Sequence, residues 1–164
     1  MAKRLKFCAA LLFLTLMTSL ASAQEVRGIE IVEYGLYAVD KTDCKRDAQG
    51  IERCDRNNIR HAATTWTVPA NIGVEFGLRY RIVGRPRNAK ISIRRVWLLP
   101  GGGFQPPSGK SIDHIDRVDT VEIGQSTLMS YGFDDAWELV PGPWVVKFFY
   151  NDRELGQRTF TVVK

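Results

Sequence analysis

The last stretch of the chain, residues 142–163, alternates apolar and polar side chains with the two-residue period of a β-strand. Its first half places four large apolar side chains on one face: Trp144, Val146, Phe148 and Tyr150. Phe160 and Val162 repeat this spacing after the turn signal Asn151-Asp152. We therefore predict a β-hairpin of the kind that closes a two-layer sandwich.

The same alternation recurs through the middle of the chain. It is clearest in Gly73–Gly84 and Ala89–Leu99, which we expect to form a second hairpin around the intervening turn. Weaker strands are expected in 29–39, 62–68, 115–123 and 126–133, and 134–141 resembles a turn or a single helical turn. No helical period is sustained after Ala23, so the sequence predicts an all-β fold, an immunoglobulin-like β-sandwich of seven or eight antiparallel strands.

The amino terminus has the three parts of a secretory signal peptide. Lys3, Arg4 and Lys6 precede an apolar run, and the small residues Ala21-Ser22-Ala23 precede Gln24. The apolar run is short for a membrane span, which makes a transmembrane anchor the weaker alternative. We predict cleavage after Ala23, no transmembrane segment in the mature chain, and a periplasmic or secreted location.

Cleavage would leave residues 24–164, a length suited to one domain. Three of the 23 basic residues lie in the leader, so the mature chain carries 20 basic against 18 acidic side chains, a net charge of about +2. This small excess gives no indication of nucleic-acid binding.

Cys44 and Cys54 are the two cysteines of the predicted mature chain. In an exported protein this spacing favours a disulfide across a short charged hairpin or loop. The alternative is a metal site, but the nine intervening residues include no histidine and match no common zinc pattern.

Charge is segregated along the sequence. Residues 76–112 contain no acidic side chain, and their basic ones include Arg79, Arg81, Arg85, Arg87, Lys90 and Arg94. One interpretation is a basic surface for an anionic partner, either an anionic envelope component or an acidic protein. The competing interpretation, which we favour, is cross-strand pairing with acidic strands of the same sandwich.

No catalytic or cofactor motif is evident. The run Ser108-Gly109-Lys110-Ser111 is not a phosphate-binding loop, because Phe104 occupies the position that requires the first glycine. A metal site could draw on Asp113, His114, Asp116 and Asp119, but a solvated strand edge explains them better. No serine lies in a Gly-x-Ser-x-Gly elbow, so we predict no catalytic residue, metal or cofactor.

Aromatic residues offer one further candidate. The four tryptophans could line a pocket, but most are in phase with apolar strand faces and are expected in the core. Phe104 is isolated in a loop rich in glycine and proline, and is therefore the candidate for contact with a partner.

Three segments resemble a bacterial exported family that is known only as a domain of unknown function. They are 32–37 (VEYGLY), 73–84, and 136–144 (AWELVPGPW) with the hairpin that follows. The resemblance spans nearly the whole mature chain and implies no activity, cofactor or site residue.

Three functions follow as hypotheses. We favour a non-enzymatic binding or accessory module of the bacterial cell envelope. The alternatives are a hydrolase or metal-dependent enzyme with a site that sequence does not reveal, and a chaperone-like protein that adds a strand to its partner. The last would need a long unpaired edge, which we expect at Ile29–Val39.

Overall fold

The computed structural model of the chain describes residues 24–47, 52–107 and 109–164, and the predicted leader lies outside this part. Within these ranges the chain forms nine strands and one short 3-10 helix. They are β1 (Glu25–Arg46), β2 (Glu52–Ala63), β3 (Thr67–Pro69), β4 (Glu75–Arg85), β5 (Lys90–Leu98), β6 (His114–Glu122), β7 (Ser126–Gly132), η1 (Ala136–Glu138), β8 (Gly142–Tyr150) and β9 (Arg153–Val163). No helix among the described residues is long and apolar enough to cross a membrane.

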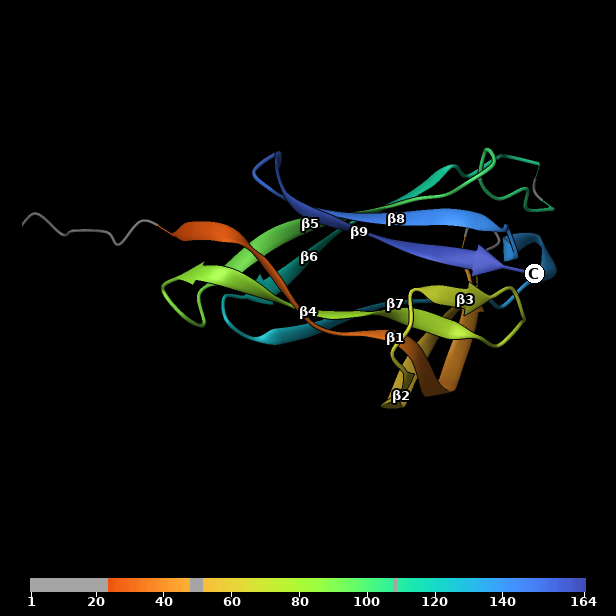
Figure 1. Cartoon of the computed structure of the whole chain (residues 1–164), viewed down its shortest axis with the longest axis horizontal. Coiled ribbons are helices and arrows are strands. Elements are labelled where there is room, and N and C mark those ends of the chain that lie inside the picture. Colours follow the sequence, from red (N-terminus) through yellow and green to blue (C-terminus); the bar gives the residue numbers. More distant parts are fainter. Residues whose placement is uncertain (1–23, 48–51, 108) are drawn as a thin grey trace, which may run out of the picture.

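The strands form two sheets that pack face to face (Figure 1). The first sheet has the order β2-β1-β4-β7, and the second has the order β3-β9-β8-β5-β6. All neighbouring strands are antiparallel except β3 and β9, which run parallel over three residue pairs. The predicted closing hairpin is confirmed, since β8 pairs with β9 across the turn at Asn151-Asp152.

The predicted hairpin of Gly73–Gly84 with Ala89–Leu99 is wrong. β4 pairs with β1 and β7 in the first sheet, whereas β5 pairs with β6 and β8 in the second. The turn between β4 and β5 therefore crosses from one sheet to the other, as does the turn between β6 and β7. The two-residue period indicates which side chains face the core, but it does not indicate in which of the two sheets a strand pairs.

The core between the sheets is an aromatic cluster. The Phe76 ring lies 5.3–5.7 Å from the rings of Trp97, Trp144, Phe133 and Phe160. Trp144 is fully buried and its indole Nε1 donates to the Val140 carbonyl at 2.9 Å. Burial of such large side chains from every long strand of the sandwich supplies the main driving force for folding.

β1 and β2 extend beyond the sandwich as a two-stranded arm, which we define as residues 38–46 and 52–60. The arm descends from the first sheet and then turns back toward the far side of the molecule (Figure 1). Arg56 of the arm contacts Glu75 of β4, which in turn accepts a hydrogen bond from Ser130 of β7. Since Glu75 lies on the outer face of the first sheet, the arm crosses that face beneath β4 and β7.

Candidate functional site

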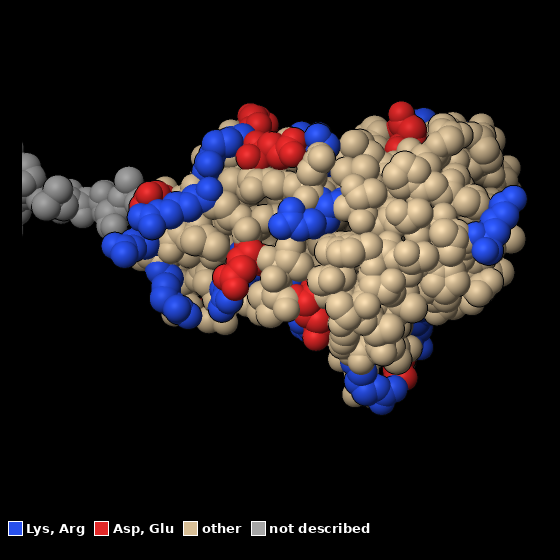
Figure 2. Space-filling model, in the orientation of Figure 1, with Lys and Arg blue, Asp and Glu red and all other residues tan. Residues whose placement is uncertain are grey.

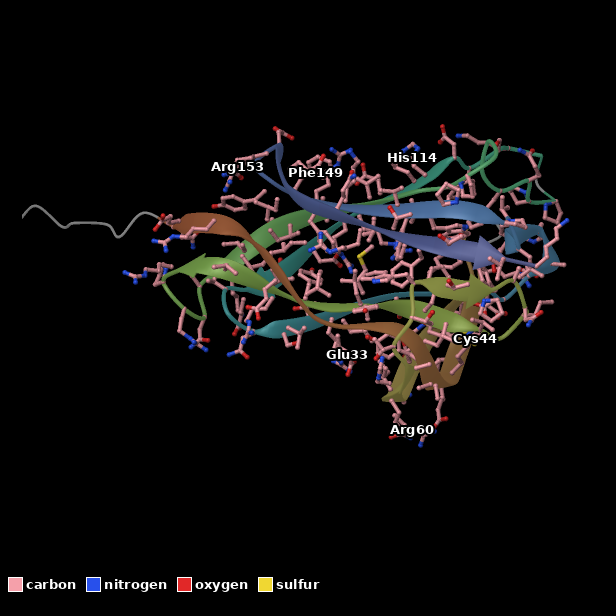
Figure 3. All side chains as sticks on the ribbon, in the orientation of Figure 1. Glu33, Cys44, Arg60, His114, Phe149 and Arg153 are labelled. Carbon is pink, nitrogen blue, oxygen red and sulfur yellow. A yellow bond between two sulfur atoms is a disulfide. The ribbon has the colours of Figure 1, made fainter. Side chains whose placement is uncertain are left out.

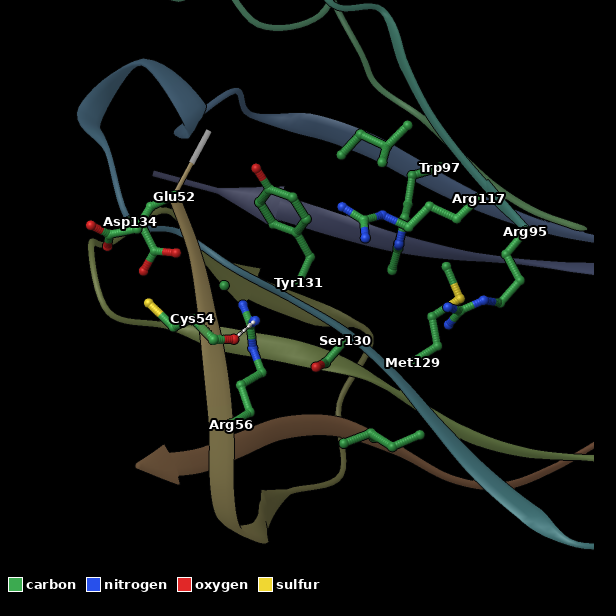
Figure 4. A pocket seen from close by; sticks show the side chains of 13 residues that line it. Glu52, Cys54, Arg56, Arg95, Trp97, Arg117, Met129, Ser130, Tyr131 and Asp134 are labelled. Carbon is green, nitrogen blue, oxygen red and sulfur yellow. Dashed lines mark hydrogen bonds between the residues drawn. The ribbon is translucent and has the colours of Figure 1, made fainter. Parts of the chain in front are cut away.

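A cleft opens along one side of the sandwich, between the edge strands β6 and β7. It has a volume of about 350 Å³. The described residues that line the cleft come from three parts of the fold. β7 contributes one wall, β5 and β6 contribute the other, and the arm closes one end through Glu52, Cys54 and Arg56 (Figure 4). Because these segments are far apart in sequence, the cleft exists only in the folded chain.

The floor of the cleft is apolar and aromatic. Trp97, Ile115, Met129 and Tyr131 line it, and each is at most 9% exposed. The Tyr131 hydroxyl donates to Glu138 Oε1 at 2.6 Å, which fixes the ring from behind. Glu138 also accepts the backbone N–H groups of Asp134 and Asp135, so the η1 turn and the cleft wall are joined. Burial raises the pKa of the Glu138 carboxyl despite these hydrogen bonds.

Two arginines from the second sheet point into the space between the sheets. Arg95 of β5 and Arg117 of β6 are direct cross-strand partners, and both line the cleft. They share the inner face with the buried residues Trp97 and Ile115, which are the next inward pair along the same ladder. Arg95 donates from Nε to Asp119 Oδ2 at 2.6 Å, and its side chain is 13% exposed.

The third arginine, Arg56, is held by the arm. Its Nε donates to Glu75 Oε1 at 2.7 Å, and its Nη1 donates to the Cys54 carbonyl at 3.2 Å (Figure 4). The Glu75 carboxylate is fully buried, also accepts Ser130 Oγ at 2.6 Å, and lies 3.9 Å from Lys41 Nζ. Lys41 is paired with Asp134 at the rim of the cleft. This network anchors the arm to the sheet and thereby places one end wall of the cleft.

The predicted disulfide is present. Cys44 and Cys54 are bonded across the two strands of the arm. Among the described residues, one group of three potential metal ligands has its donor atoms within 4.8 Å of one another, and it consists of these two cysteines and Glu52. Because both sulfurs are joined to each other, this group is a disulfide beside a carboxylate.

Three of the six residues of the predicted anionic-partner surface are paired within the fold. Arg79 and Arg81 of β4 bind Glu33 and Glu30 of β1, as the register of that ladder requires. Arg94 binds Asp116 of β6 on the outer face of the second sheet. These contacts support the cross-strand interpretation, although β1 supplies two of the acids. On the face drawn in Figure 2, basic and acidic side chains are interspersed.

The other three residues of that predicted surface lie at the turn between β4 and β5. Arg85, Arg87 and Lys90 are exposed there. Their binding to an anionic partner stays a prediction.

Phe104 is not available to a partner. Its side chain is fully buried and contacts the rings of Tyr131, Trp137 and Trp144. The loop folds back on itself, because Phe104 and Ile112 form an antiparallel bridge. The prediction of a partner contact at Phe104 is therefore wrong: the loop is part of the core at this end of the sandwich.

The two histidines lie away from the cleft. His61 Nε2 donates to the Tyr34 carbonyl at 3.0 Å, next to the stacked rings of Tyr34 and Trp66. These residues line a second, more open hollow on the opposite side of the sandwich. His114 points outward from the second sheet and contacts Asp113 (Figure 3).

The edge proposed for strand addition is interrupted. β1 pairs with β4 from Glu25 to Tyr37, and with β2 only from Leu36 onward. Bulges at Arg27 and Val32 break the spacing of the earlier part, and side chains of His61 and Arg153 bind two of its carbonyls. This edge therefore lacks the long regular row of backbone groups that an added strand requires.

Sequence reasoning missed Arg95 and Arg117, although a signal for both was present. In β5 the apolar positions Ile91, Ile93 and Trp97 run in phase, and Arg95 occupies the gap between them. In β6, Arg117 likewise falls in phase with Ile115 and Val121. A charged residue at an inward position marks either a buried ion pair or a site.

Two mainly antiparallel sheets, packed face to face and closed by the β8–β9 hairpin, define an immunoglobulin-like β-sandwich. The chain belongs to the family described as Domain of unknown function (DUF3859), whose sequence model matches residues 25–162. Both the fold class and the family resemblance predicted from the sequence are thus confirmed.

Solved structures agree with this fold. An immunoglobulin-like protein from Pseudomonas aeruginosa is 27% identical, with a TM-score of 0.60 over 87% of this chain and 99% of that protein. The alkylpurine DNA glycosylase AlkC of Pseudomonas fluorescens is 14% identical, with a TM-score of 0.39 over 62% of this chain and 28% of the glycosylase. This second resemblance is too weak to bear on function. No protein with a curated description matches the chain.

Proposed function

We propose that this protein is an exported, non-enzymatic binding module of the bacterial cell envelope, and that its ligand occupies the cleft between β6 and β7. The observation that carries the proposal is the convergence of three distant segments on one semi-enclosed volume. Apolar and aromatic side chains form its floor and charged groups line its walls, so the cleft offers a small ligand both apolar and charged contacts.

The arrangement of nucleophiles and bases favours binding over catalysis. Ser130, the serine that lines the cleft, donates to Glu75, and the cleft's described lining includes no histidine. A serine nucleophile needs a base that can take its proton and is itself held by a third group. A fully buried Glu75 that is already bound to Arg56 is poorly suited to that role.

A substitution that fills the cleft tests the proposal. Leu128 lines the cleft on β7 and is partly exposed, so Leu128→Trp would place an indole in the opening. Val118→Trp is the matched control, because Val118 is 66% exposed on the outer face of the neighbouring edge strand β6.

The three proteins would be incubated with the small-molecule fraction of a bacterial envelope extract, washed by ultrafiltration, and analysed by mass spectrometry. We expect the wild type and Val118→Trp to retain the same compound, and Leu128→Trp to lose it. Equal retention by all three proteins, or none by the wild type, would contradict a binding role for the cleft.

Export is a separate part of the proposal, and it rests on the basic, apolar and small-residue parts of residues 1–23. Expression of the full chain in a Gram-negative host should yield a periplasmic protein whose intact mass corresponds to a first residue of Gln24. A cytoplasmic protein that retains its first 23 residues would refute export and leave the binding role of the cleft untouched.

A further inference from the structure

The second sheet ends in a long and regular edge strand. β6 runs from His114 to Glu122 and pairs with β5 along its whole length without a register shift. It is the last strand in the order β3-β9-β8-β5-β6, so no other strand among the described residues pairs with its outer edge. Its outward backbone N–H and C=O groups therefore form a template for another extended chain.

The other edges of the two sheets are less suited to pairing. Register shifts interrupt the pairing of β2 with β1, β3 has three residues and ends at Pro69, and β7 has seven residues. Irregular or short strands and prolines are the usual protection of a sheet edge. β6 is nine residues long and contains neither proline nor lysine. Its outer face carries Val118, which at 66% is the most exposed large apolar side chain among the described residues.

The sequence of β6 is complementary to itself when it is read in the opposite direction. In an antiparallel pair of two β6 strands, a twofold axis through Val118 places residues that are equally distant from Val118 opposite each other. The pairs are Arg117 with Asp119, Asp116 with Thr120, Ile115 with Val121, and His114 with Glu122. Apolar residues therefore meet apolar residues, and no two like charges are opposed.

The charges favour this register over its neighbours. A twofold axis at Arg117 or at Asp119 would place two guanidiniums or two carboxylates directly opposite each other, which is destabilising. With the axis at Val118, the facing charges have opposite signs. The argument needs no free side chain, because Asp119 stays bound to Arg95 and Arg117 keeps its own interaction within the chain.

We propose that this protein forms a twofold-symmetric dimer in which the β6 strands of two copies pair antiparallel about Val118. An axis perpendicular to the sheet keeps the inward faces inward, so the two second sheets become one continuous sheet. A second copy fits this edge because the apolar and charged positions of β6 complement themselves. The inference goes beyond the proposed function, since the described walls of the cleft come from one chain.

Disulfide trapping tests the position of the axis. In Val118→Cys the two new side chains would face each other with Cβ atoms about 4.5–5.5 Å apart, close to the span of a disulfide. Thr120→Cys is the matched control, because Thr120 is also exposed on the outer face of β6. Thr120 would lie four residues, or about 13 Å, from its copy.

Under mild oxidation we expect Val118→Cys to give at least about tenfold more covalent dimer than Thr120→Cys, because only its sulfurs are within bonding reach. Non-reducing electrophoresis measures the yield, and peptide mapping by mass spectrometry identifies the bond between the two copies.

Charge substitutions at the same position test the pairing without a covalent bond. A single strand edge is a small interface, so we expect sedimentation equilibrium to give a wild-type Kd of about 10–100 μM. Val118→Lys and Val118→Glu should each weaken dimerisation by about tenfold or more, because like charges then meet at the axis. An equimolar mixture of the two variants should recover a dimer. Thr159→Lys is the control, at an exposed position of β9 in the same sheet, and should dimerise like the wild type.

Three results would overturn this inference. The first is a wild type that stays monomeric at about 1 mM, well above the expected Kd. The second is equal cross-linking of Val118→Cys and Thr120→Cys, which would indicate random collision or a different register. The third is a dimer that neither Val118→Lys nor Val118→Glu weakens, which would place the interface elsewhere. Circular dichroism establishes that each variant is folded.

Discussion

Replacement of Glu75 by glutamine tests whether the arm is fastened to the sandwich by a buried charge. The Glu75 side chain is fully buried on the outer face of the first sheet, where the arm covers it. It accepts hydrogen bonds from Arg56 at 2.7 Å and from Ser130 at 2.6 Å, and Lys41 lies 3.9 Å away. Glutamine has nearly the same shape but no charge, so the change removes the electrostatic contacts and leaves the packing in place.

The magnitude follows from the burial of the partners. Removal of one member of a fully buried ion pair costs about 3–5 kcal/mol. Arg56 and Lys41 remain 25% and 20% exposed, so water partly solvates them once the carboxylate is gone. Glutamine also keeps one acceptor oxygen. We therefore expect the free energy of unfolding to fall by about 2–3 kcal/mol, or a loss of about 6–12 °C in melting temperature for a domain of this size.

Urea unfolding followed by tryptophan fluorescence measures this loss, and Glu30→Gln is the control. Glu30 lies on the same outer face and binds Arg81, but its side chain is 52% exposed. Its replacement should cost less than about 1 kcal/mol. We also expect faster tryptic cleavage within the arm of Glu75→Gln. If the two glutamine variants lose the same stability, or the arm of Glu75→Gln is cleaved no faster, the buried carboxylate does not hold the arm.

Two further predictions concern the pH dependence and the disulfide. Because burial raises the pKa of Glu138 above its ordinary value of 4.5, the folded state holds this proton more tightly than the unfolded state. The stabilisation from Glu138 is therefore fully present below pH 4.5 and is lost as pH rises through the raised pKa. The difference in unfolding free energy between the wild type and Glu138→Gln should narrow over that range; a difference that widens with pH would contradict the upward shift. For the disulfide, the double variant Cys44→Ala/Cys54→Ala should lose about 2–3 kcal/mol, the chain-entropy value for a loop with a sequence separation of 10. Chemical denaturation measures this, and a loss below about 0.5 kcal/mol would mean that the bridge constrains the unfolded chain very little.

The strands that sequence predicted best are those whose alternation is uninterrupted. Gly142–Val163 forms β8 and β9, and of the predicted inward residues Trp144, Val146, Phe148, Phe160 and Val162 are buried, while Tyr150 at the end of β8 is partly buried. The segment Ala62–Val68 was predicted as one strand, but the structure divides it, because β2 ends at Ala63 and β3 begins at Thr67. The charged residues 40–46 and 52–60 carry little apolar signal. They form the arm because its two strands pair with each other and Arg56 binds Glu75 on the outer face of the sheet.

The site was less accessible to sequence reasoning, for two physical reasons. A charge count along the chain grouped Arg79, Arg81 and Arg94 by proximity in sequence, whereas their partners are fixed by cross-strand register. Phe104 is isolated in the sequence, because its ring contacts come from Tyr131, Trp137 and Trp144, all more than 25 residues away. In both cases the deciding contacts are long-range.

The sequence by itself determined the β-sandwich class, the inward faces of the main strands and the pairing of Cys44 with Cys54. These are consequences of a two-residue period and of a short loop, which are local properties of the chain. Only the tertiary structure decided that β4 and β5 lie in different sheets, and that the arm passes beneath the first sheet to reach the cleft. The cleft that Arg56, Arg95 and Arg117 line depends on both of these features of the tertiary structure. Strand register and the connections that cross between sheets, rather than periodicity, bring its distant segments together.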